Sequence, residues 1–280
     1  MQWLGRRGSG NVFDRRGLSG GHFVAGGGVI GVVILLIKFL LGGNAGDLQQ
    51  QLQNGNQVPM TAEQKAAEDS LAQFVSVVLA DCEDVWTQIF KEQGKTYEYP
   101  KLVLFTNSTE SGCGFSSAAT GPFYCPDDNN VYIDLSFFRE MRDRFHAPGD
   151  FPIAYVVAHE VGHHVQFLLG TFDKVSRLEQ QSGGEANKYS VALELQADFY
   201  AGVWAHYEDK SKHVLDDGDI EEALTAANAI GDDRLQKQSQ GYVVPDAFTH
   251  GTSQQRMYWF KKGYETGDIS QGNTFAALNL

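Results

Sequence analysis

Residues 159–163 read His-Glu-Val-Gly-His, a pattern that is typical of a metal site. On an α-helix, His159 and His163 lie four positions apart on one face, so both imidazoles can bind a single Zn²⁺ ion while the helix stays intact. Glu160 is rotated by roughly 100° from His159. It is too far round to share that face, but near enough to take a proton from water at the ion. The pattern therefore predicts a catalytic zinc site with Glu160 as the general base.

The sequence on both sides of this pattern predicts a buried helix. Apolar residues precede it at Ile153, Val156 and Val157 and follow it at 167–169. Two imidazoles and a carboxylate in such a helix cost free energy unless they are paired or bind a metal. Core or surface histidines without a metal are the alternative, and the apolar flanks favour the metal.

A catalytic zinc ion commonly has three protein ligands and one position for water. Glu194 is the candidate for the third ligand, on an amphipathic helix expected at 187–206, and Glu185 and His164 are the alternatives. Asp198 follows Glu194 by about one helical turn. From there its carboxylate could accept a hydrogen bond from the ring N–H of a ligand histidine and fix the orientation of that ring.

The remaining pattern predicts an α+β fold that is rich in helices. Thr61 and Gln64 form a capping box at the start of one long amphipathic helix, or a pair of helices, that ends at about residue 93. Strands are expected at 101–106 and 131–135, and further helices at 136–144, 219–229 and 253–265.

The N-terminal part of the sequence predicts a membrane anchor. Residues 23–41 are apolar except for Lys38, and as a helix they are long enough to span a bilayer. Four arginines precede this run and no positive charge closely follows it. The positive-inside rule then predicts a basic cytoplasmic N-terminus at 1–22, a transmembrane anchor at 23–41, a linker at 42–60 and an extracytoplasmic domain at 61–280. A cleaved signal peptide and a buried core helix are the alternatives.

The cysteines indicate the compartment in which the protein works, and the net charge limits the partners it can bind. Cys113 and Cys125 bound a loop rich in Gly and Ser, and in an exported domain they are well placed to form a disulfide. A structural metal is the weaker alternative, and Cys82 is expected to be free in the first helix. The net charge is −13 although residues 1–43 are basic, so the body is acidic. An acidic surface argues against nucleic acid as a partner.

Several stretches together resemble one bacterial family. His159 to His163, followed by Glu194 to Asp198, is similar to the glutamate-zincin pattern of metallopeptidases. With an Arg-rich head, the apolar span and two further pairs of motifs, the sequence resembles the YpfJ-like family called "putative neutral zinc metallopeptidase" over nearly the whole chain. The head is Asn11-Val-Phe-Asp-Arg-Arg-Gly17, and the pairs are Gly121-Pro-Phe-Tyr-Cys-Pro126 with Val131-Tyr-Ile-Asp134, and Phe248-Thr-His-Gly251 with Gln255-Arg256. Family members often carry Cys where this chain has Phe199 and Gly272, so a disulfide there is absent.

The resemblance implies a zincin-like fold, with a small sheet packed on the metal-binding helix, and a zinc peptidase that acts on peptides or proteins at the bacterial inner membrane. Glu160 would pass the proton of the water to the leaving amine, and one further donor would stabilise the oxyanion. His250 is the candidate donor, Tyr200 and Tyr264 are others, and a loop histidine bonded only locally is the alternative. The strand at 131–135 is expected to be the sheet edge that pairs with the peptide. Two other functions stay open: a zinc-binding but inactive partner of envelope proteins, and a metal amidase acting on cell-wall peptides.

Overall fold

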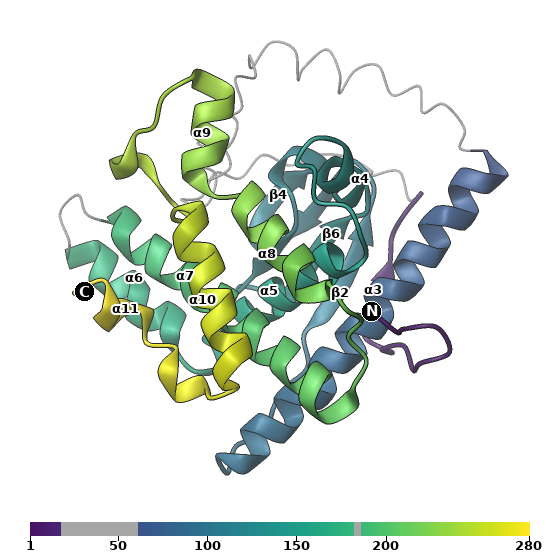
Figure 1. The fold of residues 1–280 in the computed structure, drawn as a ribbon, viewed down its shortest axis with the longest axis horizontal. Helices are drawn as coiled ribbons and strands as arrows, with labels where there is room; N and C mark the ends of the chain where they lie inside the picture. The colour runs from purple at the N-terminus through teal and green to yellow at the C-terminus, as the bar shows by residue number, and fades with distance from the viewer. Residues whose placement is uncertain (18–60, 182–185) are drawn as a thin grey trace.

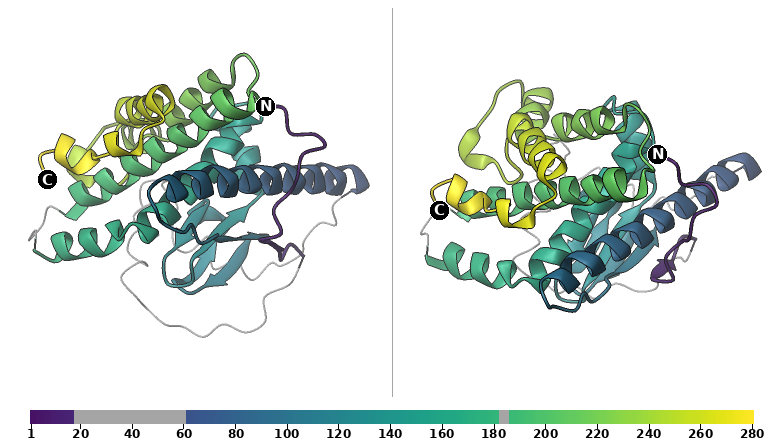
Figure 2. Two further views of the ribbon diagram at one scale, coloured as in Figure 1. Left: turned by 90° about the horizontal axis from the view of Figure 1, so that it is seen from below. Right: turned by 60° about the horizontal axis from the view of Figure 1, so that its bottom comes forward.

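Helix α5 (Phe151–Leu168) runs through the middle of the molecule, with a sheet on one side of it and helices on the other (Figures 1 and 2). The computed structural model describes residues 1–17, 61–181 and 186–280. The other strands and helices in the described ranges are β1 (Val12–Asp14), α3 (Ala62–Glu92), β2 (Lys101–Phe105), β3 (Ser108–Ser111), β4 (Gly114–Ser117), β5 (Phe123–Cys125), β6 (Asn130–Asp134), α4 (Ser136–Asp143), α6 (Thr171–Gln181), α7 (Ala186–Tyr207), α8 (Asp219–Ala229), α9 (Asp232–Gln240), α10 (Ser253–Thr266) and α11 (Thr274–Ala277). Short 3₁₀ turns at Ala118–Thr120, Pro245–Ala247 and Ile269–Gln271 and a π turn at Glu208–Lys212 complete them. The helix-rich α+β architecture predicted from the sequence is confirmed.

The main sheet has the strand order β1-β2-β6-β5, and a separate hairpin joins β3 to β4. β1, β2 and β6 are parallel, whereas β5 runs antiparallel to β6. The expectation that 131–135 forms the sheet edge is wrong, because β5 pairs with β6 on its outer side. The edge that lies beside α5 is therefore β5, a three-residue strand too short to show an alternating pattern in the sequence.

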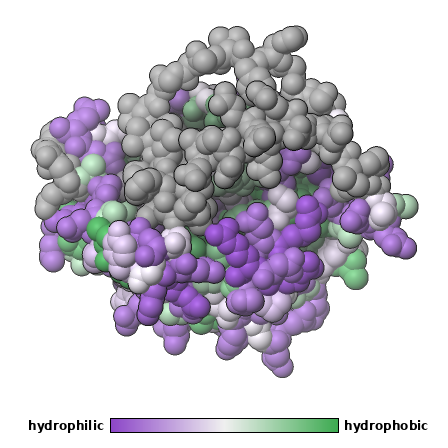
Figure 3. Space-filling model, turned by 90° about the horizontal axis from the view of Figure 1, so that it is seen from above, coloured by the Kyte–Doolittle hydropathy of each residue, from purple (hydrophilic) through white to green (hydrophobic). Residues whose placement is uncertain are grey.

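The two faces of the sheet belong to two different cores. Leu102, Leu104, Val131 and Ile133 point to one face and join the large core formed by the helices. Their neighbours along the strands point to the other face, because side chains alternate along a strand. There they form a small cluster: Val103, Phe105, Tyr132 and the disulfide-bonded Cys125. Over these layers the surface seen in Figure 3 is largely hydrophilic outside the grey atoms, with smaller hydrophobic areas between.

Helix α3 is a single long helix of 31 residues that begins with the expected capping box. The Gln64 backbone N–H donates to Oγ1 of Thr61 at 3.2 Å, and the Thr61 N–H donates to the Gln64 side chain at 2.9 Å. The later helices agree with the predicted ranges to within about a residue at most ends, including α4, α7, α8 and α10. The pattern of apolar positions was therefore sufficient to find the helices that carry the site.

Glycines allow three of these helices to approach closely. A Cβ atom on Gly202 of α7 would lie 2.0 Å from the carbonyl oxygen of Phe260 in α10, and one on Gly263 would lie 2.1 Å from that of Phe199. On α5, a Cβ atom at Gly162 would lie 3.0 Å from the backbone oxygen of Ala197. Helix α7 is therefore packed backbone to backbone between α5 and α10 (Figure 2), and residues of all three helices can meet at one point.

The N-terminal segment packs on the body of the protein, and the predicted transmembrane helix needs a correction. Residues 1–17 lie along the body: β1 pairs with β2 in the main sheet, and the Arg6 guanidinium contacts Asp81 of α3. Residues 1–17 therefore belong to the same folded body as β2 and α3. None of the helices in the described ranges is long and apolar enough to cross a membrane. The anchor at 23–41 and the linker at 42–60 lie outside those ranges, and the predicted fold with one N-terminal transmembrane helix is wrong in that part.

Candidate active site

Three potential metal ligands converge where α5 meets α7. Nε2 of His159 lies 3.2 Å from one carboxylate oxygen of Glu194, and Nε2 of His163 lies 3.5 Å from the other. Both histidines are buried, and the Glu194 side chain is 20% exposed. The structure thus brings together the two histidines of the motif and the carboxylate that the sequence analysis named as third ligand.

Both imidazole rings are held from behind by acceptor atoms. Nδ1 of His159 lies 2.9 Å from Asp198, and Nδ1 of His163 lies 2.8 Å from the amide oxygen of Gln166. Gln166 is oriented in turn, because its amide nitrogen donates to the backbone oxygen of Leu193 at 2.7 Å. Since carboxylate and amide oxygens can only accept here, each Nδ1 carries a hydrogen. A ring that is neutral, as a metal ligand must be, then presents the lone pair of its Nε2.

These separations fit a shared divalent ion. The donor atoms of His159, His163 and Glu194 all lie within 4.8 Å of one another. Two ligands about 2.0 Å from a tetrahedral zinc ion are about 3.3 Å apart, which matches both imidazole–carboxylate distances. Lone pairs aimed at one point repel each other unless a proton or a cation lies between them. Two imidazoles and one carboxylate are also a donor set that zinc prefers.

The charges at this point are strongly coupled. Burial alone would lower the pKa of His159, but the Asp198 and Glu194 carboxylates outweigh it and raise that pKa to about 10. Burial would raise the pKa of Glu194, yet the neighbouring histidines, His163 first, hold it well below its usual range. The pocket therefore keeps Glu194 ionised and attracts positive charge, which is the electrostatic setting for a metal site.

Asp198 lies at the centre of a buried network that joins three helices. It is fully buried, and Arg256 of α10 donates to both of its oxygens, from Nε at 2.8 Å and from a terminal nitrogen at 2.9 Å. The Tyr155 hydroxyl of α5 donates to it at 2.5 Å. Burial would raise the pKa of Asp198, but Arg256 and then His159 lower it to about 2. Sequence reasoning gave no role to Arg256 or Tyr155, although both lie on helices it had predicted.

Glu160 borders the same cleft and has no partner among the residues that the structure describes. This cleft has a volume of about 470 Å³, and both motif histidines, Glu160 and Glu194 line it. Glu160 is buried, and the described part of the chain offers it no hydrogen bond or ion pair. Burial raises the pKa of Glu160, although the neighbouring His159 and His163 oppose the shift. A carboxylate with raised basicity and free oxygens is suited to take up a proton.

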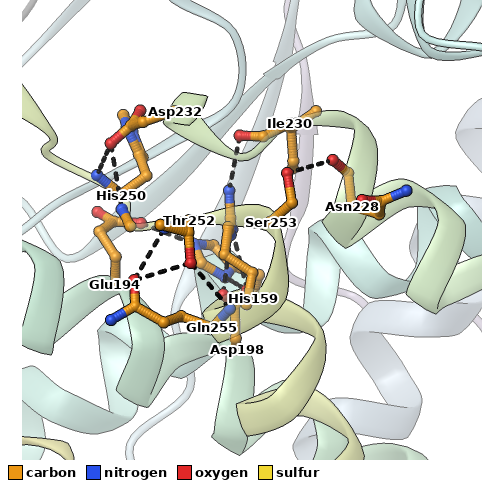
Figure 4. Close-up of polar contacts among 12 residues, drawn as sticks. His159, Glu194, Asp198, Asn228, Ile230, Asp232, His250, Thr252, Ser253 and Gln255 are labelled. Atoms are coloured by element: carbon orange, nitrogen blue, oxygen red, sulfur yellow. Dashed lines mark hydrogen bonds and ion pairs between the residues drawn. The ribbon is translucent and has the colours of Figure 1, made fainter. Parts of the chain in front are cut away.

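His250 lies beside Glu194 and is held by Asp232 (Figure 4). Nδ1 of His250 lies 3.2 Å from Asp232 and 2.9 Å from the Thr249 hydroxyl. Asp232 also accepts the backbone N–H groups of Thr249, His250 and Gly251, at 2.7, 2.6 and 3.1 Å. Burial would lower the pKa of His250, but Glu194 and Asp232 raise it above its ordinary value, which favours the donor form. His250 thus makes these local bonds and also lines the cleft.

The other candidates lie elsewhere or outside the described residues. His164 is buried on another face of α5, where it contacts the Tyr124 hydroxyl at 3.1 Å and the Glu98 carbonyl oxygen at 2.7 Å. Burial lowers the pKa of His164 to about 4, so it is a neutral core histidine. Tyr264 donates to Asp209, away from the cleft, and Tyr200 packs on Trp86. Glu185 lies outside the residues that the structure describes.

The walls of the cleft come from both layers. Edge strand β5 and the turn before it supply 121–124, close to the disulfide between Cys113 and Cys125. The other wall comes from Phe145 after α4 and from Ile230 and Leu235 around the start of α9. The cleft thus runs between the sheet edge on one side and the start of α9 on the other.

The third cysteine, Cys82, is a free thiol buried in α3, as the sequence predicted.

Comparison with known proteins agrees with this geometry. A family model described as "Putative neutral zinc metallopeptidase" matches residues 1–275. The chain belongs to that family. It is 52% identical to "Uncharacterized protein YpfJ" of Escherichia coli (strain K12) across 98% of this chain and 99% of the relative. It is also 44% identical to "Uncharacterized protein Rv2575" of Mycobacterium tuberculosis across 66% of this chain and 65% of the relative. No solved structure matches the chain.

Membership of this family confirms the resemblance stated from the motifs, and the cofactor it implies is Zn²⁺. The structure also shows how Phe199 and Gly272 lie, the two positions where family members often carry Cys. A Cβ atom on Gly272 would lie 2.5 Å from the ring of Phe199, so the two positions touch. Here an aromatic side chain fills the space against the glycine, and the fold is held at that point by packing.

Proposed function

We propose that this protein is a zinc-dependent peptidase that hydrolyses peptide bonds in the cleft between β5 and α9. The observation that carries the proposal is Glu160, a buried carboxylate that has no partner among the described residues and borders the same cleft as the three convergent ligand atoms. A protein that only stored or carried zinc would have no need of a free basic carboxylate there. When bound, the ion would supply Lewis-acid polarisation of a carbonyl and activation of water near neutral pH.

Residues of the chain would supply proton transfer, stabilisation of the oxyanion and orientation of the metal ligands. Glu160 takes a proton from the attacking water and passes it to the departing amine. His250, with Nδ1 held by Asp232 and Thr249, offers its other ring nitrogen to the oxyanion that develops on the substrate. Asp198 and Gln166 fix the two ligand rings from behind, so that neither has to reorient during the reaction.

An extended peptide has a natural docking edge in β5. This strand is the last in the order β1-β2-β6-β5, so its outer backbone groups pair with no other strand of the described sheet. A peptide that added to this edge would form main-chain hydrogen bonds and keep its side chains on alternating sides. The antiparallel direction of β5 distinguishes it from the parallel strands behind it.

The decisive experiment replaces one oxygen of the proposed base. Glu160→Gln should retain one zinc ion per chain and lose about 10²–10⁴-fold in kcat on unfolded protein substrates. The control is Glu221→Gln, which makes the same change on an exposed position of α8 and should leave both quantities unaltered. Equal cleavage by wild type and Glu160→Gln would end the assignment of the base.

The two alternative functions give different outcomes in the same assays. Zinc-loaded wild type that cleaves no peptide from a broad library would favour the inactive envelope partner. Turnover of cell-wall peptide fragments, with no turnover of ordinary peptides, would favour the metal amidase.

We also infer that the body works in an oxidising compartment. The support is the disulfide between Cys113 and Cys125, since such bonds persist outside the reducing cytoplasm. Acid-quenched cells treated with a thiol-alkylating reagent should show both cysteines protected in the native protein until a reductant is added. Full labelling without reductant would count against this compartment.

A further inference from the structure

A second pocket adjoins the active-site cleft and gathers positive charge. It has a volume of about 430 Å³ and lies between the end of α4 and the outer face of α9. Its charged and ionisable lining residues are Arg144, His146, Arg234 and Lys237. Such a group of cations is unexpected in a chain whose net charge is −13. We call it the basic pocket.

The basic pocket and the active-site cleft share a wall. Arg144 and Phe145 line both cavities. Helix α9 also faces both, since Leu235 lines the cleft while Arg234 and Lys237 on either side of it line the basic pocket. A chain lying in the cleft can therefore reach the pocket with a side chain or with its end.

The cations of the basic pocket are poorly neutralised by the described part of the protein. Arg144 has one distant ion pair, with Glu140 at 3.9 Å, and Arg234 and Lys237 have none in the described ranges. The nearby acidic groups have other partners: Asp233 accepts hydrogen bonds from Ser253, and Asp143 pairs with Arg142. Like charges that share a cavity repel, so an anion entering it would relieve that repulsion.

Helix stabilisation accounts for part of this charge but not for all of it. Arg144 caps the end of α4 and Lys237 lies in the last turn of α9, where cations favour the negative end of the helix dipole. Arg234 lies in the first turn of α9, where a cation is unfavourable. The helix dipole therefore does not account for the exposed Arg234, which lines the basic pocket.

We propose that the basic pocket is a substrate subsite that binds a carboxylate of the peptide held in the active-site cleft. This inference rests on the proposed peptidase function and adds a substrate class to it, namely peptides with an anionic group to one side of the bond that is cut. The carboxylate has two possible sources, an Asp or Glu side chain and the free C-terminus of the peptide. Arg144 and Arg234 can bind it as forked donors, with Lys237 as a point charge.

The test uses pairs of quenched fluorescent peptides that differ only by Glu or Gln at one position, scanned on both sides of the cleaved bond. Wild type should prefer the Glu peptide about tenfold in kcat/KM at one position, and the preference should shrink at high salt. In Arg234→Gln/Lys237→Gln the ratio should fall to about one. The double variant Lys65→Gln/Lys91→Gln, which removes two exposed cations of α3, should keep the wild-type ratio.

Two further measurements are needed. The first distinguishes a side-chain carboxylate from the C-terminal carboxylate, and the second tests binding without requiring catalysis. Peptides without acidic residues, with free or amidated C-termini, show whether the terminal carboxylate is the ligand. Binding of the Glu and Gln peptides to zinc-loaded Glu160→Gln is measured by calorimetry and needs no turnover. Equal affinity and equal cleavage for acidic, neutral and amidated peptides, or a preference that survives Arg234→Gln/Lys237→Gln, would overturn the subsite. Cleavage of no peptide at all, with a binding preference intact, would overturn the peptidase function and leave the pocket standing.

Discussion

Replacing Arg256 by methionine should test the network behind the metal site. The Arg256 side chain is 4% exposed and Asp198 is fully buried, so neither charge has water as a substitute partner. Arg256 is the only described partner of the second Asp198 oxygen, at 2.8 Å. Arg256→Met keeps the length of the side chain but leaves that oxygen without a donor. Breaking a buried pair from one side costs about 3–5 kcal/mol.

The measurement is urea or thermal unfolding of the protein with a chelator present, so that metal binding does not contribute. A loss of this size corresponds to a fall in Tm on the order of 10 °C for a domain of this length. The control is Arg139→Met, which removes an exposed pair with Glu68 at 2.8 Å and should cost less than about 1 kcal/mol. Zinc affinity, measured by chelator competition, should also fall about 10–100-fold in Arg256→Met, because the orientation of His159 depends on Asp198.

A loss below about 1 kcal/mol in Arg256→Met would refute this reasoning, since it would mean that Asp198 is satisfied without the guanidinium. A large loss of stability with unchanged zinc affinity would refute the proposed effect on zinc binding. The network would then stabilise the fold without orienting His159. The double variant Asp198→Asn/Arg256→Met measures the coupling energy between the two residues. It should be less destabilised than the sum of the two single changes, since residues in one network are coupled.

Two other substitutions test the supports of the site. The pKa of Asp232 is lowered because its bonds to His250 and to backbone N–H groups outweigh the effect of burial, so the stability it contributes is complete above about pH 4 and is lost as the pH falls through the lowered folded-state pKa. Asp232→Asn should therefore cost about 2 kcal/mol in unfolding at pH 7 and converge with wild type in acid; a constant difference across this range would contradict the assignment. Gly202→Ala should cost about 3 kcal/mol or more, because its Cβ atom would lie 2.0 Å from the Phe260 carbonyl oxygen, whereas Gly10→Ala, with nothing within 4 Å, is the control.

The sequence was sufficient for features that depend on local pattern. The long run of α3, the α5 helix and the helix that carries Glu194 and Asp198 all follow from apolar spacing and from capping signals. The same spacing carries a signal for Arg256 that went unused. It lies on the face of α10 that also holds Trp259, Phe260 and Gly263, and a cation at an apolar position requires a buried partner.

The features that were missed depend on contacts between distant parts of the chain. β1 and β5 are strands of three residues, and only their pairing with β2 and β6 makes them strands. The packing of residues 1–17 on the body was missed for the same reason. Charge and hydropathy at 1–41 indicate an anchor, but they carry no information on the register of Val12–Asp14 with a strand that follows much later in the chain.

The Asp198 network also shows why the site depends on three helices. A buried ion pair is weak evidence for stability, because well-packed apolar residues can replace it at little cost. An apolar residue at 198 could not accept the Nδ1 hydrogen of His159, and without that bond the ring could turn its Nε2 away from Glu194. Hydrogen bonds from Arg256 and Tyr155 offset the free-energy cost of burying the Asp198 carboxylate at the point where α5, α7 and α10 meet. The close glycine packing of α7 on α10 is therefore a requirement of ligand orientation, and the stability and zinc affinity of variants in this region should change together.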